Sequence, residues 1–153
     1  MIIRKSLIAA GAIALAAGVA SCSSDESTEA TTATSTADAA AAIPTVEELQ
    51  ATLVTFFDPA VATTEKAVLV ENGNGQAAVL EQFNGVLQGY PLTTEVTKVA
   101  AVDADTVSAT TTITGPHGGA ASEVVFEQVD GKWVLSEDAA CTIFSMGKLT
   151  CVK

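Results

Sequence analysis

The chain has 153 residues and a formal net charge of −11 at pH 7, with 18 acidic residues against 7 lysines and arginines. Charge of this sign repels nucleic acid and anionic lipid head groups, which argues against a nucleic-acid-binding role and against a polybasic membrane role. The single His and the cysteine spacing offer no metal-binding pattern, so we expect neither a metal nor another cofactor.

The first 21 residues have the pattern of a signal peptide. Arg4 and Lys5 precede an apolar run over residues 6–18. As a helix this run would reach roughly 20 Å, which is shorter than the ~30 Å hydrocarbon core of a bilayer. A basic start, a short apolar run and small residues before a cleavage site are typical of an export signal rather than a membrane span. Its removal lowers the count of lysines and arginines from 7 to 5, so the mature charge is 5 − 18 = −13.

The end of this segment, Val19-Ala20-Ser21-Cys22, resembles the lipobox of bacterial lipoproteins. The resemblance implies that the thiol of Cys22 receives a diacylglycerol, that the signal peptide is cut before Cys22, and that acyl chains of the palmitate kind hold the mature protein on the extracytoplasmic face of the cell membrane. More than one acyl chain gives stable anchoring. The alternative is an ordinary signal peptide beside an unrelated cysteine, which would give a secreted, released protein.

Residues 22–43 are predicted to form a disordered tether. They are almost entirely Ser, Thr, Ala, Asp and Glu. Such a composition cannot offset the cost of ordering the backbone, about 1–2 kcal/mol per residue. A domain boundary is therefore expected near Pro44, with one folded domain over residues 44–153.

The cysteine count predicts one disulfide. With Cys22 assigned to the lipid, Cys141 and Cys151 remain as a pair in an exported protein, where disulfides persist. Closing so short a loop is worth roughly 2.5–3 kcal/mol in the chain-entropy model.

Helices are expected in the first half of the domain. Thr45 and Glu48 form a capping-box pattern, and the apolar residues that follow share one face of a helix over residues 46–57, which an Asp-Pro pair ends. A helical turn or two is expected near residues 66–70. A second helix is predicted over residues 76–88.

After Pro91 the apolar period changes from 3.6 to 2, which indicates strands. Asp130-Gly131 is a strong hairpin signal, and Ser136 has the character of an N-cap for a short last helix reaching about Phe144. We expect an α+β fold in which N-terminal helices pack on a four-stranded antiparallel sheet. Helices followed by antiparallel strands is also the element order of the cone-shaped nuclear-transport-factor-2-like fold, which we expect here by analogy. The strands are predicted over residues 92–102, 107–113, 122–129 and 132–135, with a loose loop over 115–119.

Several short motifs, in this order, resemble the C-terminal domain of the mycobacterial low molecular weight antigen family of the Mtb-twelve type. The resemblance covers Pro44 to about Ser145. It implies an exported or surface-associated protein of mycolic-acid bacteria (actinobacteria), noted as an antigen, and it brings no catalytic residue with it. The motifs are Pro44-Thr45 with Glu48-Leu49, Asp58-Pro59, Lys66 with Leu69-Val70-Glu71-Asn72-Gly73, Gly115-Pro116, Val125-Phe126, Gly131, and Trp133-Val134-Leu135-Ser136.

The residues that most often carry chemistry have structural interpretations here. His117 is expected on an exposed loop tip, Tyr90 as a packing residue at a helix end, and Trp133 in the core. Glu123 and Glu127 alternate along one strand and are expected on a solvated face. No catalytic residue is therefore predicted.

Three functions remain open, and we favour the first. The first is a lipid-anchored envelope protein with a small domain that binds an envelope component or a protein partner. The second is a carrier of an apolar small molecule, held between helices and sheet. The third is a small hydrolase or isomerase, which would need a buried carboxylate facing a cavity. A filled core favours the first function, and a cavity lined by Phe56, Phe83, Val86 or Phe126 favours the second.

Overall fold

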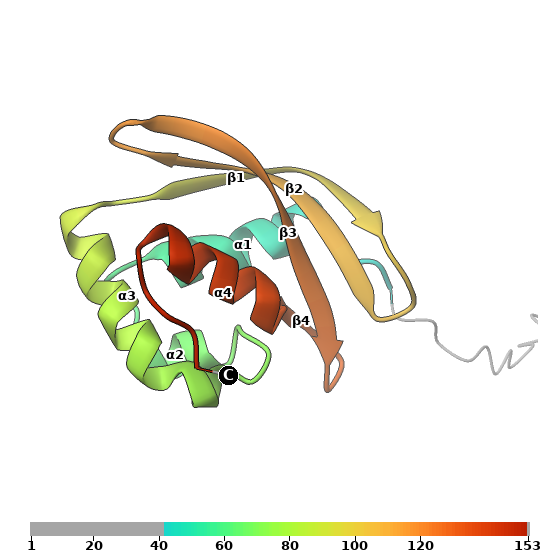
Figure 1. The fold of residues 1–153 in the computed structure, drawn as a ribbon. Helices are drawn as coiled ribbons and strands as arrows, with labels where there is room; N and C mark the ends of the chain where they lie inside the picture. Colours follow the sequence, from blue (N-terminus) through green and yellow to red (C-terminus); the bar gives the residue numbers. More distant parts are fainter. Residues whose placement is uncertain (1–41, 153) are drawn as a thin grey trace, which may run out of the picture. The chain divides into compact units, whose positions relative to one another are not determined.

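The computed structural model describes residues 42–152. The predicted signal peptide, Cys22 and the tether up to residue 41 lie outside the described residues. Ala42 and Ile43, the last residues of the predicted tether, are exposed and lack regular structure. In chain order (Figure 1) the elements are α1 (Val46–Phe57), α2 (Thr63–Ala67), the 3-10 helix η1 (Gly73–Gln76), α3 (Ala77–Gly89), β1 (Thr93–Ala101), β2 (Thr106–Gly115), β3 (Gly118–Val129), β4 (Lys132–Leu135) and α4 (Glu137–Met146).

Helix α1 begins and ends where the sequence predicts. Thr45 Oγ1 accepts a hydrogen bond from the Glu48 amide at 3.2 Å, and the Glu48 carboxylate accepts one from the Thr45 amide at 2.8 Å. This reciprocal pair satisfies two amides that would otherwise lack partners at the helix start. The buried face of α1 carries Leu49, Leu53, Phe56 and Phe57.

The four strands form one antiparallel sheet in the order β1-β2-β3-β4. Asp130 and Gly131 both have positive φ (50° and 75°), as a two-residue type I′ hairpin turn requires. A bulge between Val96 and Lys98 interrupts the register of β1 with β2. The α+β class with N-terminal helices, a four-stranded antiparallel sheet and a short C-terminal helix is confirmed, while the cone shape stays a prediction.

The loose loop predicted over residues 115–119 is wrong. Gly115 pairs with Gly118, so Pro116 and His117 alone form a tight turn, and β3 begins four residues before the predicted Ser122. Gly118 has a φ of +116°, which glycine adopts without strain. The small residues here have little intrinsic strand preference, so pairing with β2 decides their conformation.

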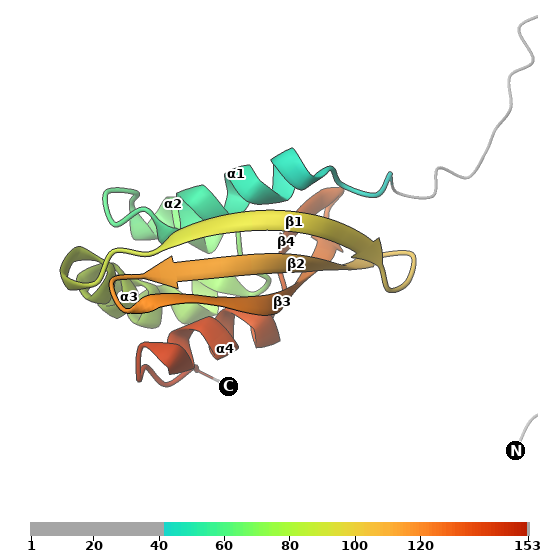
Figure 2. The ribbon, with the colours of Figure 1, turned by 90° about the horizontal axis from the view of Figure 1, so that it is seen from above.

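All helices that touch the sheet lie on one of its faces. Figure 2 shows α1 running beside β1 and α4 beside β3, in agreement with the contacts of these elements. The side chains of Val107, Ala109, Val124 and Phe126 point to this covered face and are buried. The opposite face is mostly polar and carries Ser108, Thr110 and Glu123, which are joined by hydrogen bonds.

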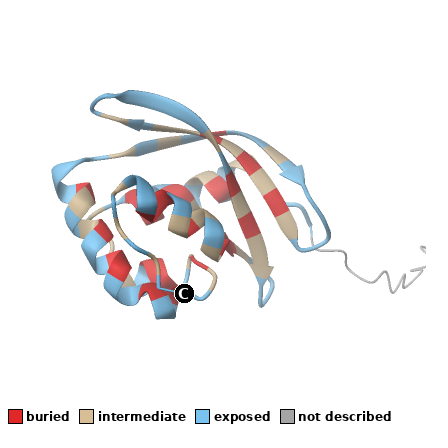
Figure 3. Cartoon of the chain, viewed as in Figure 1, coloured by how far each residue is buried: buried red, intermediate tan, exposed pale blue. Residues whose placement is uncertain are grey.

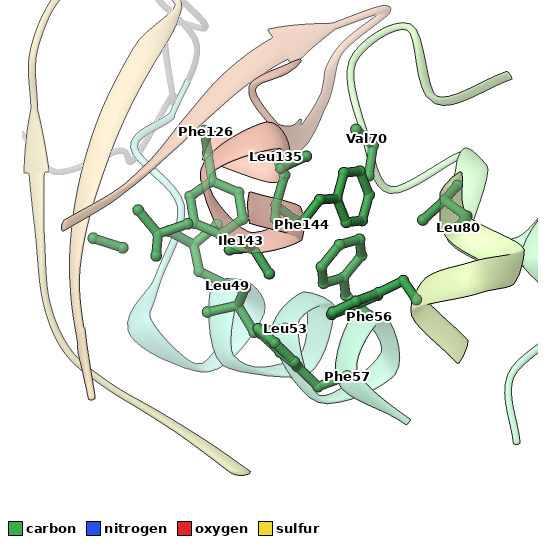
Figure 4. Packing of buried hydrophobic residues seen from close by; sticks show 14 of the residues in the cluster. Leu49, Leu53, Phe56, Phe57, Val70, Leu80, Phe126, Leu135, Ile143 and Phe144 are labelled. Atoms are coloured by element: carbon green, nitrogen blue, oxygen red, sulfur yellow. The ribbon is translucent and has the colours of Figure 1, made fainter. Parts of the chain in front are cut away.

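The interior between sheet and helices is filled by aromatic rings (Figure 4). The ring centroids of Phe56 and Phe83 are 5.3 Å apart, as are those of Phe83 and Phe144. Phe56, Phe126 and Phe144 are fully buried, and Phe83 is 1% exposed. Such spacings are those of favourable tilted and edge-on contacts, so this cluster forms the packed centre of the core.

One edge of the sheet is covered by a side chain from α1. Gln50 accepts a hydrogen bond from the Val96 amide at 2.7 Å and donates one to the Thr94 carbonyl at 2.9 Å. The carboxamide thus takes the place of a neighbouring strand along β1. This contact satisfies part of a backbone edge that would otherwise be open to pairing with another chain.

The C-terminal tail is attached to the body of the domain at two places. Cys141 and Cys151 form a disulfide with their Cα atoms 5.4 Å apart, as the cysteine count predicts. The buried carboxamide of Gln76 donates to the Val152 carbonyl at 2.7 Å and accepts from the Val152 amide at 3.1 Å.

Within residues 42–152, no helix combines the length and the apolar character that crossing a bilayer would require.

Candidate functional site

The candidate site is an open groove of about 590 Å³ at one end of the sheet. It lies between the end of α3, the end of α4 and the β2–β3 hairpin. In Figure 1 these ends lie together on the left, at the opposite end of the domain from the start of α1. The lining residues are Phe83, Val86, Tyr90, Leu92, Ile113, Gly115, His117, Gly118, Gly119, Ala120, Ile143, Met146, Gly147 and Lys148.

The floor of the groove is apolar because it is the outer surface of the hydrophobic core. Phe83 and Ile143 belong to the buried cluster, and Leu92 and Ile113 pack against it while remaining partly exposed. Met146 is 57% exposed at the end of α4. Figure 3 shows buried positions on the helices giving way to exposed ones toward the hairpin. An apolar concave surface that remains open is typical of small-ligand sites.

Two aromatic side chains from distant parts of the sequence form one rim of the groove. The rings of Tyr90, after α3, and His117, in the hairpin turn, lie with centroids 5.7 Å apart. Gly115 permits this arrangement, because a Cβ there would lie 2.6 Å from Cε1 of Tyr90. His117 is exposed at the turn, as the sequence predicts, and Tyr90 is 36% exposed. Tyr90 therefore packs on the hairpin rather than inside the core.

Lys148 contributes a positive charge to the groove from an unusual backbone position. The Leu149 amide donates to the Phe144 carbonyl at 3.0 Å and the Lys148 amide donates to the Ser145 carbonyl at 2.9 Å, which is the Schellman pattern at the end of α4. Lys148 has a φ of 60°, whereas Gly147 has a φ of −80°. The left-handed position, which glycine usually holds, costs a lysine about 1 kcal/mol. Sequence reasoning missed this residue, although a Gly-Lys pair after a predicted helix was visible.

No Asp or Glu is among the residues that line this groove. The carboxylates gather instead at a separate cleft of about 440 Å³ between β3 and the start of α4, where Glu71, Glu123 and Glu137 are found. Hydrogen bonds from the hydroxyls of Ser108 (2.6 Å) and Thr110 (2.9 Å) lower the pKa of Glu123. This acidic cleft is part of the solvated surface predicted for Glu123.

Trp133 is half-buried and packs against the core, and its indole nitrogen donates to the Ala42 carbonyl at 3.3 Å. It lies outside the groove. Cys22, the predicted lipid site, lies outside the described residues. Over residues 42–152, no group of three or more His, Cys, Asp or Glu side chains is placed to hold a metal ion.

A buried lysine, which sequence reasoning did not single out as a site, lies under α3. Lys66 is fully buried, and its ammonium donates to Oδ1 of Asn84, while Asn84 Nδ2 donates to the Val61 carbonyl at 3.1 Å. Burial lowers the pKa of Lys66 from 10.5 to about 8, against the opposing charge of Asp58. Lys66 does not line the groove, and its polar contacts indicate a structural role.

Comparison with known proteins gives one result at the level of the family. The family model described as low molecular weight antigen MTB12, C-terminal domain, matches residues 42–151, which is most of the chain. No curated protein matches the sequence significantly. The match agrees with the resemblance carried by the short motifs, from Pro44 to Ser136. The chain therefore belongs to the family of the low molecular weight antigen MTB12 C-terminal domain.

Proposed function

We propose that this protein is an exported, lipid-anchored protein of the cell envelope whose folded domain binds an apolar ligand in the groove at the end of the sheet. The observation that carries the binding function is the groove itself, with an apolar floor of about 590 Å³ formed by the surface of the core. Lipid anchoring through Cys22 rests on the lipobox pattern of the sequence.

The position of the groove is compatible with an anchored protein. The described residues begin at Ala42, just before α1, and the β2–β3 turn, whose residues line the groove, lies at the opposite end of the sheet (Figure 2). We expect the groove to remain accessible in the anchored protein.

Binding is better supported than catalysis. The groove lining offers Tyr90 and His117 as polar aromatic groups, but no carboxylate to orient either of them. A general acid or base normally works with a second group that positions it. The proposed site is therefore one that holds a ligand without transforming it.

The filled interior argues against an enclosed carrier cavity and favours the first of the three functions, with an apolar envelope component bound at the surface. Of the four residues expected to line a cavity, Phe56 and Phe126 are fully buried in the core, and Phe83 and Val86 reach the groove. A protein partner docking on the same end of the domain is the second candidate, and it is favoured by the exposed Met146.

The binding function can be tested with a neutral fluorescent probe, N-phenyl-1-naphthylamine, and two tryptophan variants. Ala120→Trp fills the groove, and Ala100→Trp places the same side chain at an exposed strand position outside the groove. We expect Ala120→Trp to weaken probe binding by roughly tenfold or more, and Ala100→Trp to leave it unchanged. Equal binding by both variants and the unmodified chain would refute the groove as the site.

The anchoring function can be tested by the intact mass of the mature protein isolated from its own envelope. We expect the mass of residues 22–153 plus acyl chains, with a gain of two hydrogens on reduction of the Cys141–Cys151 disulfide. A mass without acyl chains would make the protein a released one.

A further inference from the structure

Resting on the proposed function, we propose that the ligand of the groove is an acyl chain that ends in a single carboxylate, with the chain on the apolar floor and the carboxylate paired with Lys148. The inference comes from the juxtaposition of three segments far apart in the sequence. The end of α3, the β2–β3 turn and the end of α4 meet at one end of the domain (Figure 1), and Tyr90, His117 and Lys148 from these segments are all among the residues that line the groove.

Charge complementarity selects an anionic head group. The whole chain has 18 acidic and 7 basic residues, and yet the groove is lined by one lysine and no acidic residue. On a surface of this composition, a concave region without carboxylates is the place where an anion meets the least repulsion. The acidic cleft near Glu137 would repel the same ligand.

The backbone at Lys148 indicates that its side chain, rather than its backbone, is what the position requires. A glycine at this position would complete the Schellman turn without strain, and Gly147 stands one residue before it in an ordinary conformation. A lysine that only neutralised the carbonyl end of α4 could lie anywhere in the last helical turn. The left-handed lysine therefore points to a function for the ammonium at the groove.

The number of charges favours a carboxylate over a phosphate. Lys148 is the one permanent cation among the lining residues, and the hydroxyl of Tyr90 supplies a neutral donor. A carboxylate carries one negative charge, which one lysine balances. A phosphate monoester carries about −1.5 to −2 at pH 7 and would leave charge without a partner.

The apolar part of the ligand is matched by the floor of the groove. The partly exposed Val86, Leu92 and Ile113 and the exposed Met146 provide the apolar contact surface, and the flexible Met146 adapts to chains of different shape. The volume of about 590 Å³ lies within the range of roughly 300–1,000 Å³ that holds one small ligand.

The disulfide positions the proposed cation before the ligand arrives. Lys148 lies within the loop that Cys141 and Cys151 close, and the Leu149 amide is bonded to α4. A residue held in this way loses little further freedom on binding, which favours affinity.

The test uses the full mature chain, residues 22–153, carrying Cys22→Ser so that its own acyl chains do not compete. Displacement of N-phenyl-1-naphthylamine is measured with dodecanoate, dodecanol and dodecyl phosphate. We expect dodecanoate to displace the probe at a roughly tenfold lower concentration than dodecanol, as one charge-assisted hydrogen bond predicts, and to compete better than dodecyl phosphate.

Three variants test whether Lys148 causes the preference for dodecanoate over dodecanol. Lys148→Gln and Lys148→Gly should both abolish the preference for dodecanoate over dodecanol while retaining probe binding, and Lys132→Gln, at an exposed lysine of β4, should keep it. Lys148→Gly should also melt at a higher temperature, which shows that lost binding is not lost folding.

The outcomes separate the two proposals. Equal displacement by dodecanoate and dodecanol, or stronger displacement by dodecyl phosphate, would overturn the carboxylate ligand and leave the apolar groove standing. Failure of the neutral probe to bind the unmodified chain would overturn the proposed function and this inference together. A preference for dodecanoate that survives Lys148→Gln would overturn the role of Lys148.

Discussion

Because Lys66 is buried, the free energy of unfolding of the domain changes with pH in the alkaline range. The side chain is fully buried, and desolvation lowers its pKa from 10.5 to about 8 in the folded protein. Between these two pH values the unfolded chain binds a proton at Lys66 that the folded chain does not bind. The free energy of unfolding therefore rises with pH across this window and is lowest, as far as Lys66 contributes, below pH 8.

The size of the effect follows from the same two values. At 1.36 kcal/mol for each pH unit, a pKa lowered from 10.5 to about 8 corresponds to about 3 kcal/mol. This is a large part of the stability of a small domain, about 5–15 kcal/mol. The hydrogen bond to Asn84 Oδ1 and the ring of Phe83, whose centroid is 5.9 Å from the ammonium, compensate only part of the lost hydration.

The assay is urea unfolding at several pH values between 7 and 10.5, on the unmodified chain and on Lys66→Met. We expect the free energy of unfolding of the unmodified chain, minus that of Lys66→Met, to increase by about 3 kcal/mol from pH 7 to pH 10.5. Every other titrating group is shared by the two proteins and cancels in this difference. Lys98→Met, at an exposed lysine of β1, is the control and should show no such change.

Parallel pH profiles for the unmodified chain and Lys66→Met would refute the reasoning. They would mean that the ammonium of Lys66 reaches water in the folded protein, so that its burial among α2 and α3 is incomplete in solution. A difference that decreases with pH would contradict the sign of the shift itself.

Three further predictions concern stability and are measured by chemical and thermal unfolding. Cys141→Ser should lower the free energy of unfolding by roughly 2.5–3 kcal/mol and lower the melting temperature, and an unchanged melting curve would mean that the bridge contributes nothing. Gly73→Ala should lower the free energy of unfolding by about 3 kcal/mol, because the added Cβ would lie 2.1 Å from the backbone oxygen of Ala67. Gly85→Ala in α3 is the matched control, because its Cβ meets open space, and it should raise the free energy of unfolding by about 0.5–1 kcal/mol. A Gly73→Ala variant more stable than Gly85→Ala would contradict the packing around Gly73. Gln50→Leu should lower the free energy of unfolding by about 1–3 kcal/mol and promote association of the protein through the uncovered edge of β1. Gln82→Leu, at an exposed glutamine of α3, is the control and should have neither effect. A Gln50→Leu variant as stable and as monomeric as the parent would rule out protection of this edge by Gln50.

The ends of several elements are fixed by signals a few residues long. The capping box of Thr45 and Glu48 sets the start of α1, Ser136 caps α4, and Asp130-Gly131 makes the last hairpin. Each of these is a contact between residues no more than four apart, so its pattern can be recognised in the sequence without knowledge of the tertiary structure. The α+β class and the pairing of Cys141 with Cys151 follow from the order of such elements and from a count of cysteines.

Other features exist only because distant segments meet. The strand at Gly118 forms because β2 lies beside it, and the burial of Lys66 depends on Asn84, 18 residues further along the chain. The residues next to Gly118 and Lys66 in the sequence do not indicate that Gly118 is in a strand or that Lys66 is buried.

The groove most clearly separates what the local sequence determines from what the tertiary structure determines. From the sequence, Tyr90 is a residue at a helix end, His117 a loop tip, and Lys148 one lysine among several. The packing of α3 and α4 against the sheet places all three at one apolar surface. Local propensity determines which elements form, because it acts over neighbouring residues, whereas the site is made by the ends of those elements, and only the burial of the shared core decides how the ends meet.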